Sequence, residues 1–227
     1  IDINMKNFFL IFYFLIPFFL VSCTGQYSPM NTKYPTINEY LVSMNIETKD
    51  ESDVVVCSGY NCNYITQIYF SESDLFSIKK IFKEVNGRTS YEERQMIAAA
   101  IATMEVITGD IVGTKNDKGG VLENHHIGNP EKQDCVDESA TSTSYLLFLQ
   151  KNELIFLHDV VVPQARGALI DGRWPHFSAV IREKLSGQQY VVDSWYRDNG
   201  LPPVIIELKK WIYDWRSSSK VNNEQLS

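Results

Sequence analysis

The sequence lacks an excess of positive charge. Its 227 residues include 21 Lys and Arg against 28 Asp and Glu, which gives a formal net charge of −7. A protein that binds nucleic acid in general needs a basic face for the phosphates, so this balance argues against nucleic acid as a partner. Apolar residues make up 44% and charged residues 22%, as in ordinary soluble globular proteins. The length suggests one domain, or one domain with a tether.

Near its beginning the chain lacks an apolar run long enough to cross a membrane comfortably. Residues 8–21 are almost entirely apolar, interrupted by Pro17, whereas a spanning helix needs roughly 20 such residues. Lys6 supplies a positive charge just before the run, and we take Met5 as the start of translation. A short apolar run after a basic residue is typical of a secretory signal peptide.

The apolar run ends in the sequence LVSC at residues 20–23, which resembles the lipobox of bacterial lipoproteins. The resemblance implies a signal peptide over residues 1–22 and a lipid on Cys23 that anchors the mature chain to a membrane of the cell envelope, outside the cytoplasm. Thr24 follows the cysteine, a pattern that implies the periplasmic face of the outer membrane if the cell is Gram-negative. An ordinary signal peptide with a chance cysteine, or an uncleaved anchor, is the alternative.

Beyond the signal peptide, composition divides the chain into a tether and one domain. Residues 23–53 are polar and irregular, with one short ordered piece expected around Tyr40, and residues 54–227 have the hydrophobic patterns of a single domain. Two β-rich runs around a Gly/Asn loop predict a hairpin at 54–57 and 64–70. We further expect helices at 73–85, 90–107, 135–151 and 208–215, and strands at 155–162, 177–182 and 190–195. Helices followed by antiparallel strands predict an α+β fold.

The second of these helices has the clearest local signals. Ser90 and Glu93 have the S-x-x-E spacing of a capping box, and Gly109 follows the predicted end of the helix. Ile97, Ile101 and Met104 recur at helical spacing and predict its buried stripe.

The sequence has few cysteines, and one of them has no assigned partner. Of the four, Cys23 is assigned to lipid, while Cys57 and Cys62 lie on the two arms of the predicted hairpin, where a disulfide would close. The rival interpretations are two free thiols, or a metal site made by Cys57 and Cys62 with His125 and His126. The spacing of that metal site suits zinc poorly. We therefore expect no metal and no cofactor. Cys135 then remains without a partner, as either a buried inert thiol or a reactive one.

Three residues in the second half of the chain have the types that nucleophilic catalysis needs. Cys135 begins a predicted helix, His176 begins a predicted strand, and Asp193 lies near the end of the next strand. A hairpin turn near Gly187 would bring the histidine beside the aspartate. At a helix N-terminus the free N–H groups and the dipole stabilise a thiolate. An adjacent histidine would stabilise it further as an ion pair, and an aspartate fixes the tautomer of that histidine.

This order of Cys, His and Asp on a helix and two neighbouring strands resembles the transglutaminase-like branch of the papain-like cysteine enzymes. The resemblance implies a papain-like core with the Cys-bearing helix packed on an antiparallel sheet, with Cys135 as nucleophile, His176 as base and Asp193 orienting the histidine. It covers about a third of the chain. The local sequences DCVDES, PHFSAV and VDSW, at 134–139, 175–180 and 192–195, also resemble a group of bacterial proteins of no established activity. The tryptophan that typical transglutaminases have just after the cysteine is absent.

The expected function is acyl transfer on an amide, by hydrolysis or transamidation, with an envelope protein or peptide as substrate. The backbone N–H of Cys135 and, more weakly, the Gln133 side chain would serve an oxyanion hole. Acidic residues near the thiol oppose this chemistry because they raise its pKa; they are Asp134, Asp137 and Glu138, the last two also suited to the first helical turn. The alternative is a catalytically silent envelope protein, in which Cys135, His176 and Asp193 are structural.

Other residues near these motifs have a structural interpretation by default. We expect Trp174 and Trp195 to be core or cleft walls and His158 to be structural without a named partner. Arg166 and Arg173 are expected in an exposed loop before His176, at the rim of a cleft.

Overall fold

The computed structural model describes residues 34–47, 54–82, 88–167 and 175–213. Its elements are α1 (Ile37–Ser43), β1 (Val54–Ser58), β2 (Tyr64–Ile68), α2 (Glu72–Ile81), α3 (Ser90–Val112), η1 (Thr114–Asn116), η2 (Asn124–His126), α4 (Cys135–Lys151), β3 (His158–Arg166), β4 (His176–Glu183), β5 (Gln189–Asp193), β6 (Val204–Glu207) and α5 (Leu208–Tyr213). The described strands form an antiparallel β1-β2 hairpin and an antiparallel sheet of order β3-β4-β5-β6. This confirms the predicted α+β class.

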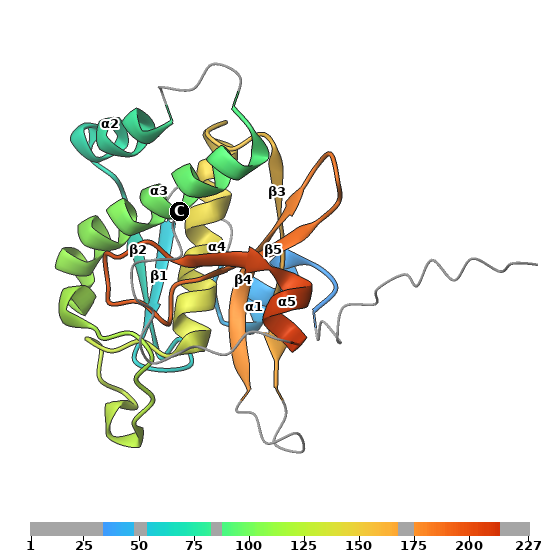
Figure 1. The fold of residues 1–227 in the computed structure, drawn as a ribbon. Coiled ribbons are helices and arrows are strands. Elements are labelled where there is room, and N and C mark those ends of the chain that lie inside the picture. The colour runs from blue at the N-terminus through green and yellow to red at the C-terminus, as the bar shows by residue number, and fades with distance from the viewer. Residues whose placement is uncertain (1–33, 48–53, 83–87, 168–174, 214–227) are drawn as a thin grey trace, which may run out of the picture.

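Helix α4 is the centre of the molecule. It contacts β1 on one side and β3, β4 and β5 on the other, and Figure 1 shows it between the hairpin and the larger sheet. The main core lies where α4, α3 and the two sheets meet, and its fully buried side chains include Ile97, Ile101, Met104, Leu146 and Leu149. Three of these were predicted from the helical stripe in α3. At about 25 cal/mol per Å², such burial is the main force that holds α4 in place.

The two faces of the larger sheet are covered by different helices. Ala179, Ile181 and Val192 join the main core with α4, whereas Val180 and Val191 pack against α5. Alternation of side chains along a strand accounts for this division. The sheet is thus buried on both faces where β4 and β5 pair, which accounts for the consecutive apolar residues at 179–181 and 190–192.

Helix α3 begins and ends differently from the prediction. Its capping box joins Thr89 to Glu92, one residue before the predicted pair, so Glu93 is released to point into the core, where it is 0% exposed. The helix also continues past Gly109 and ends at Gly113, whose φ of 97° suits a glycine C-cap. A Cβ on Gly109 would lie 2.7 Å from Asn199 Oδ1, so this glycine permits a close approach and does not end the helix.

Helix α3 is also the one described helix that is long and apolar enough to cross a membrane, but half of its most apolar window is buried inside the molecule. Core packing therefore accounts for its apolar character.

Several other boundaries needed correction. Strand β3 begins at His158, three residues after the predicted start, and reaches Arg166. Strand β6 was not predicted, because its four residues read as the approach to the last helix. Helix α1 lies inside the segment assigned to the tether, yet Tyr40 and Leu41 are buried against the domain. The ordered domain therefore begins before residue 54.

Candidate active site

Cys135 is the first residue of α4, as predicted from the sequence. Asp134 caps the helix by accepting hydrogen bonds from the backbone N–H groups of Val136 and Asp137, at 3.0 and 2.9 Å. Asp137 completes a capping box through the backbone N–H of Asp134. Two acidic residues thus hold the helix end on which the thiol lies. A first-turn role was expected for Asp137, whereas the capping by Asp134 was not predicted.

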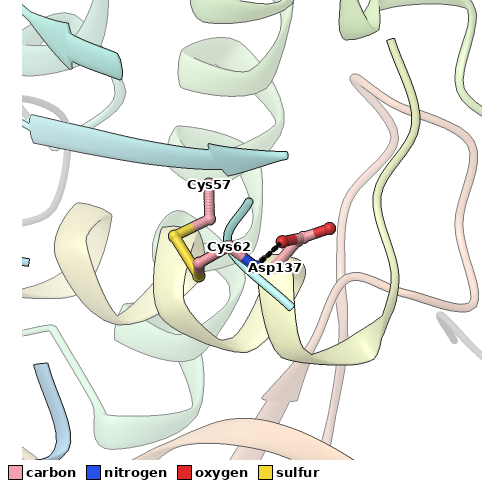
Figure 2. Close-up of side chains that lie close together, drawn as sticks. All are labelled: Cys57, Cys62 and Asp137. Atoms are coloured by element: carbon pink, nitrogen blue, oxygen red, sulfur yellow. Dashed lines mark hydrogen bonds between the residues drawn. A yellow bond between two sulfur atoms is a disulfide. The ribbon is translucent and has the colours of Figure 1, made fainter. Parts of the chain in front are cut away.

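A left-handed turn closed by a disulfide holds the same helix end. Cys57 and Cys62 are joined by a disulfide, and Tyr60, Asn61 and Cys62 all have positive φ, between 53° and 69°. This conformation turns two backbone N–H groups toward Asp137, that of Tyr60 at 2.8 Å and that of Cys62 at 2.6 Å. Figure 2 shows the disulfide and the bond from Cys62 to the carboxylate. The sequence predicted the cysteine pair but not its link to the helix that begins at Cys135.

Asp137 is therefore a buried carboxylate with several donors. It is 0% exposed, and burial, with the neighbouring Asp134 carboxylate, raises its pKa to about 8, while hydrogen bonds from the backbone of Asp134, Cys62 and Tyr60 act to lower it. Breaking any one of these bonds would leave a buried polar group without compensation.

His176 and Asp193 lie together as the sequence predicted. His176 Nε2 lies 2.8 Å from Asp193 Oδ2, and both side chains are buried. Trp211 of α5 donates its Nε1–H to the same oxygen at 2.9 Å. Within the described chain, His176 Nδ1 and Asp193 Oδ1 are buried and make no hydrogen bond. Asp193 Oδ2 thus has hydrogen-bond partners in both His176 and Trp211, whereas Nδ1 of the His176 ring has none among the described residues.

Cys135 lies near the beginning of β4, the strand that His176 begins. His176 and Asp193 share the alternation of Val180 and Val191, so they lie on the α5 face of the sheet, whereas the body of α4 packs on the other face. Cys135 begins α4, and its thiol lies close enough to the backbone of Phe177, the neighbour of His176 in the chain, for that backbone to lower the thiol pKa. Among the described residues, His176 Nδ1 makes no hydrogen bond to the thiol. Cys135 and His176 are therefore neighbours at the strand's end, and not across a sheet face.

The thiol is neutral in this environment. Burial, helped by the carboxylates of Asp134 and Asp193, raises the pKa of Cys135 to about 12, although the backbone of Phe177 opposes the shift. The sequence analysis expected a thiolate held by the histidine, with the acidic flanks as the opposing effect. Because Cys135 is only 9% exposed, desolvation raises the pKa of its thiol more than the neighbouring carboxylates do.

Aromatic side chains surround His176. The ring centroids of Trp195, Tyr196 and Trp211 lie 4.9, 5.0 and 5.6 Å from that of His176. Trp195 is thus a wall of the site, as expected. Trp211 was predicted only as part of a last helix, since nothing in the sequence linked α5 to Asp193.

Arg166 is not the exposed loop residue that the sequence suggested. It ends β3, pairs with His176 across the strands and is 8% exposed. Its Nη1 donates to the carbonyl oxygen of Trp211 at 2.6 Å and its Nη2 to the hydroxyl of Tyr196 at 2.9 Å, while the guanidinium lies 4.4 Å from the Trp211 ring. Arg166 therefore ties α5 to the sheet behind the histidine.

The remaining predicted residues have varied positions. Gln133 is buried, and its Nε2 donates to the carbonyl oxygen of Cys57 at 2.9 Å, which gives it a structural bond between β1 and the start of α4. The predicted lipid site Cys23 and the residues Arg173 and Trp174 lie outside the described residues.

The rival metal site does not assemble from the residues proposed for it. Cys57 and Cys62 group with Asp137, whereas His125 and His126 group with Glu123. The two sets of ligand atoms are separate clusters.

Two buried acids behind the site were missed. Glu138 was assigned to the first turn of the helix, but it is 8% exposed, and burial with the charge of Glu105 raises its pKa well above the ordinary value. Burial raises the pKa of Glu105 to about 7, and Glu105 accepts the backbone N–H of Gly200 at 2.9 Å. Glu105 is in α3 and Glu138 is in α4, so they become neighbours only in the folded chain. No local sequence pattern could therefore reveal their interaction.

His158, expected to be structural without a named partner, has two. Its Nδ1 lies 2.9 Å from Glu93 Oε1, and its Nε2 lies 3.2 Å from Arg94 Nη1. Glu93 also accepts the backbone N–H groups of Phe156, Leu157 and His158. This second carboxylate–histidine pair joins α3 to β3.

Comparisons with protein-family models, with curated proteins and with solved structures find no match to this chain.

Proposed function

We propose that this chain is an exported cysteine acyl-transfer enzyme with a papain-like, transglutaminase-like core, in which Cys135 is the nucleophile. The observation that carries the proposal is the buried His176–Asp193 pair, whose Nδ1 is unsatisfied while its Nε2 lies on the aspartate. A buried ring nitrogen without a partner costs about 1–3 kcal/mol, a cost that a base at the start of a reaction would explain. The neighbouring thiol at a helix N-terminus supplies the nucleophile.

The first step follows from the neutral state of the thiol. A rotation about the Cα–Cβ bond of Cys135 turns the S–H toward His176 Nδ1, which takes the proton as the sulfur attacks the carbonyl carbon of an amide. Asp193 stabilises the imidazolium, and the Cys135 backbone N–H donates to the developing oxyanion. The imidazolium then protonates the departing amine, which leaves a thioester on Cys135.

The second step regenerates the enzyme. His176 removes a proton from water or from an acceptor amine, which attacks the thioester carbonyl, and the proton returns to the sulfur. Water gives hydrolysis and an amine gives transamidation. The lipobox resemblance at residues 20–23 extends the proposal to a lipid anchor on Cys23 in the cell envelope, with an envelope protein or peptide as substrate.

One observation favours a second candidate, a catalytically silent envelope protein that keeps this fold for binding or structure. Cys135 is largely buried, and the pKa of its thiol is raised to about 12. A small buried thiol with that environment is also what a purely structural cysteine shows.

An active-ester burst separates the two candidates. The full chain is mixed with excess p-nitrophenyl acetate, and an enzyme releases nitrophenol in a burst that approaches one equivalent, with the acetyl group mapped to Cys135 by mass spectrometry. Cys135→Ser is the matched control and abolishes the burst. Acetylation only at lysines, or an equal signal in the control, would leave the silent protein as the better account.

A further inference from the structure

A cluster of metal-ligand side chains lies away from the thiol, on the short turn η2. Glu123, His125 and His126 each offer a ligand atom, and these three atoms all lie within 4.8 Å of one another. His125 Nε2 lies 3.2 Å from Glu123 Oε2, and the two imidazole rings have centroids 4.1 Å apart. Ligand atoms around one zinc ion are separated by about 3–4 Å, since each lies about 2.0–2.2 Å from the metal. Small side-chain rotations would bring the three to that spacing.

The four histidines of the chain divide into two kinds. His158 and His176 are buried and each is bound to a carboxylate of the core. The side chain of His125 is 71% exposed and that of Glu123 is 52% exposed, so ions in solution reach them. His126 is partly exposed and packs against the ring of Tyr60, whereas His125 and Glu123 are turned to solvent.

Tyr60 supports the cluster from behind. Its hydroxyl lies 3.4 Å from His126 Nδ1, 3.3 Å from the backbone N–H of Glu123 and 3.4 Å from the carbonyl oxygen of Val121. One set of roles satisfies all three contacts: the phenol accepts from His126 and Glu123 and donates to Val121. His126 then carries its proton on Nδ1, which leaves the Nε2 lone pair for a metal. Such an outer partner commonly orients a metal-binding histidine.

The loop is anchored at its base to the disulfide turn. The backbone N–H of Gly128 donates to the Gly59 carbonyl oxygen at 2.9 Å, and the Gly59 N–H donates to the Lys132 carbonyl oxygen at 2.7 Å. Tyr60 follows Gly59 within the turn that the Cys57–Cys62 disulfide closes. The ligands therefore stand on a fixed base, which lowers the entropy that binding must overcome.

We propose that Glu123, His125 and His126 form a surface site for a divalent transition metal, independent of the acyl-transfer site. Two imidazoles and one carboxylate suit Zn²⁺ and Ni²⁺, whereas Mg²⁺ and Ca²⁺ prefer oxygen ligands alone. Three protein ligands leave a coordination position for water or for a group of a partner molecule.

Titration calorimetry with Zn²⁺ tests the site. All proteins are full chains that carry Cys135→Ser, so that the thiol beside His176 cannot bind the metal. The parent binds one equivalent of Zn²⁺ through this cluster, and both His125→Ala and His126→Ala lose that binding. Tyr60→Phe weakens it by about 10–100-fold, as loss of an outer-shell partner does. Glu131→Gln, which changes an exposed carboxylate on the same loop, leaves the affinity unchanged.

Several results would overturn the site. They are absence of saturable Zn²⁺ binding, binding that survives either histidine variant, and Ca²⁺ binding as tight as that of Zn²⁺. His125, His126 and Glu131 are on an irregular loop, and Tyr60→Phe removes only the hydroxyl of a buried residue. Circular dichroism is therefore expected to show an unchanged fold in each variant.

Discussion

The two buried carboxylate–histidine pairs of this protein have similar distances but differ in whether their remaining polar atoms make hydrogen bonds. His158 lies 2.9 Å from Glu93, and His176 lies 2.8 Å from Asp193. Around the first pair the second ring nitrogen meets Arg94, and the carboxylate takes three backbone N–H groups. Around the second, one ring nitrogen and one carboxylate oxygen are buried without a hydrogen bond in the described structure.

A short His–carboxylate distance alone does not show what role the histidine has. A pair whose atoms are all satisfied stabilises the fold, because each bond replaces one lost from water. A pair with a buried ring nitrogen that makes no hydrogen bond within the described residues carries a cost, which a water molecule or a reacting group would relieve. The neighbours of a pair, and not its own His–carboxylate distance, decide which of its atoms stay available to another partner.

The largest expected effect is on chemistry at the second pair. His176→Asn lowers the rate of Cys135 acetylation by about 10²–10⁴-fold, the range for loss of a general base. His158→Asn is the matched control, and it leaves that rate within a few-fold of the wild type under conditions where it stays folded. Stopped-flow release of nitrophenol measures both. Equal losses in the two variants would show that the pairs do not differ as described.

The next effect is on stability at the first pair. Glu93→Gln replaces a carboxylate that serves His158 and three backbone donors, and we expect the free energy of unfolding to fall by about 3–5 kcal/mol, as for a broken buried pair. Urea denaturation followed by circular dichroism measures the loss. Asp193→Asn is the comparison, with a smaller loss because fewer donors depend on it. A larger loss for Asp193→Asn would reverse the assignment of the structural pair.

A smaller effect is expected from the indole that holds Asp193. Trp211→Phe keeps an aromatic side chain, although a smaller one, and removes the Nε1–H, whose hydrogen bond to a charged group is worth about 1.5–3 kcal/mol. We expect the acetylation rate to fall by about 10-fold, with a changed pH profile because Asp193 and His176 are less well oriented. A purely structural tryptophan would lower stability and leave the pH profile of the remaining activity unaltered.

The smallest expected effect is on stability in acid. Hydrogen bonds from His158 and the backbone outweigh burial and lower the pKa of Glu93 below its ordinary 4.5. A lowered folded-state pKa contributes stability that is complete above the ordinary pKa and is lost as pH falls through the folded value. Urea midpoints of wild type should therefore decline below about pH 4.5, more steeply than those of Glu93→Gln. Parallel declines would mean that other carboxylates dominate acid unfolding.

Local patterns predicted much of this fold. Helical spacing gave the buried stripe of α3, and the turn at Gly187 placed His176 beside Asp193. Boundaries failed where tertiary contacts decided them: Gly109 was taken as a helix end, although it admits Asn199 within a continuing helix.

Only part of the candidate site could be predicted from the sequence. The residue types of Cys135, His176 and Asp193 and their order were visible in the sequence. Three features of the site were not visible in the sequence: the desolvation of the thiol, the hydrogen bond from Trp211 to Asp193, and the hydrogen bonds of the disulfide turn to Asp137. Each depends on residues that are far apart in the chain. Arg166 shows the same limit, since its position opposite His176 arises only from strand pairing.

The pH dependence of Cys135 acetylation, in wild type and His176→Asn, tests the central claim most directly. If the imidazole removes the proton from a neutral thiol, the wild-type rate levels off far below the thiol pKa of about 12, whereas the variant rate continues to rise with pH. If the two profiles coincide, and both follow only ionisation of the sulfur, His176 is not the base and the account is contradicted.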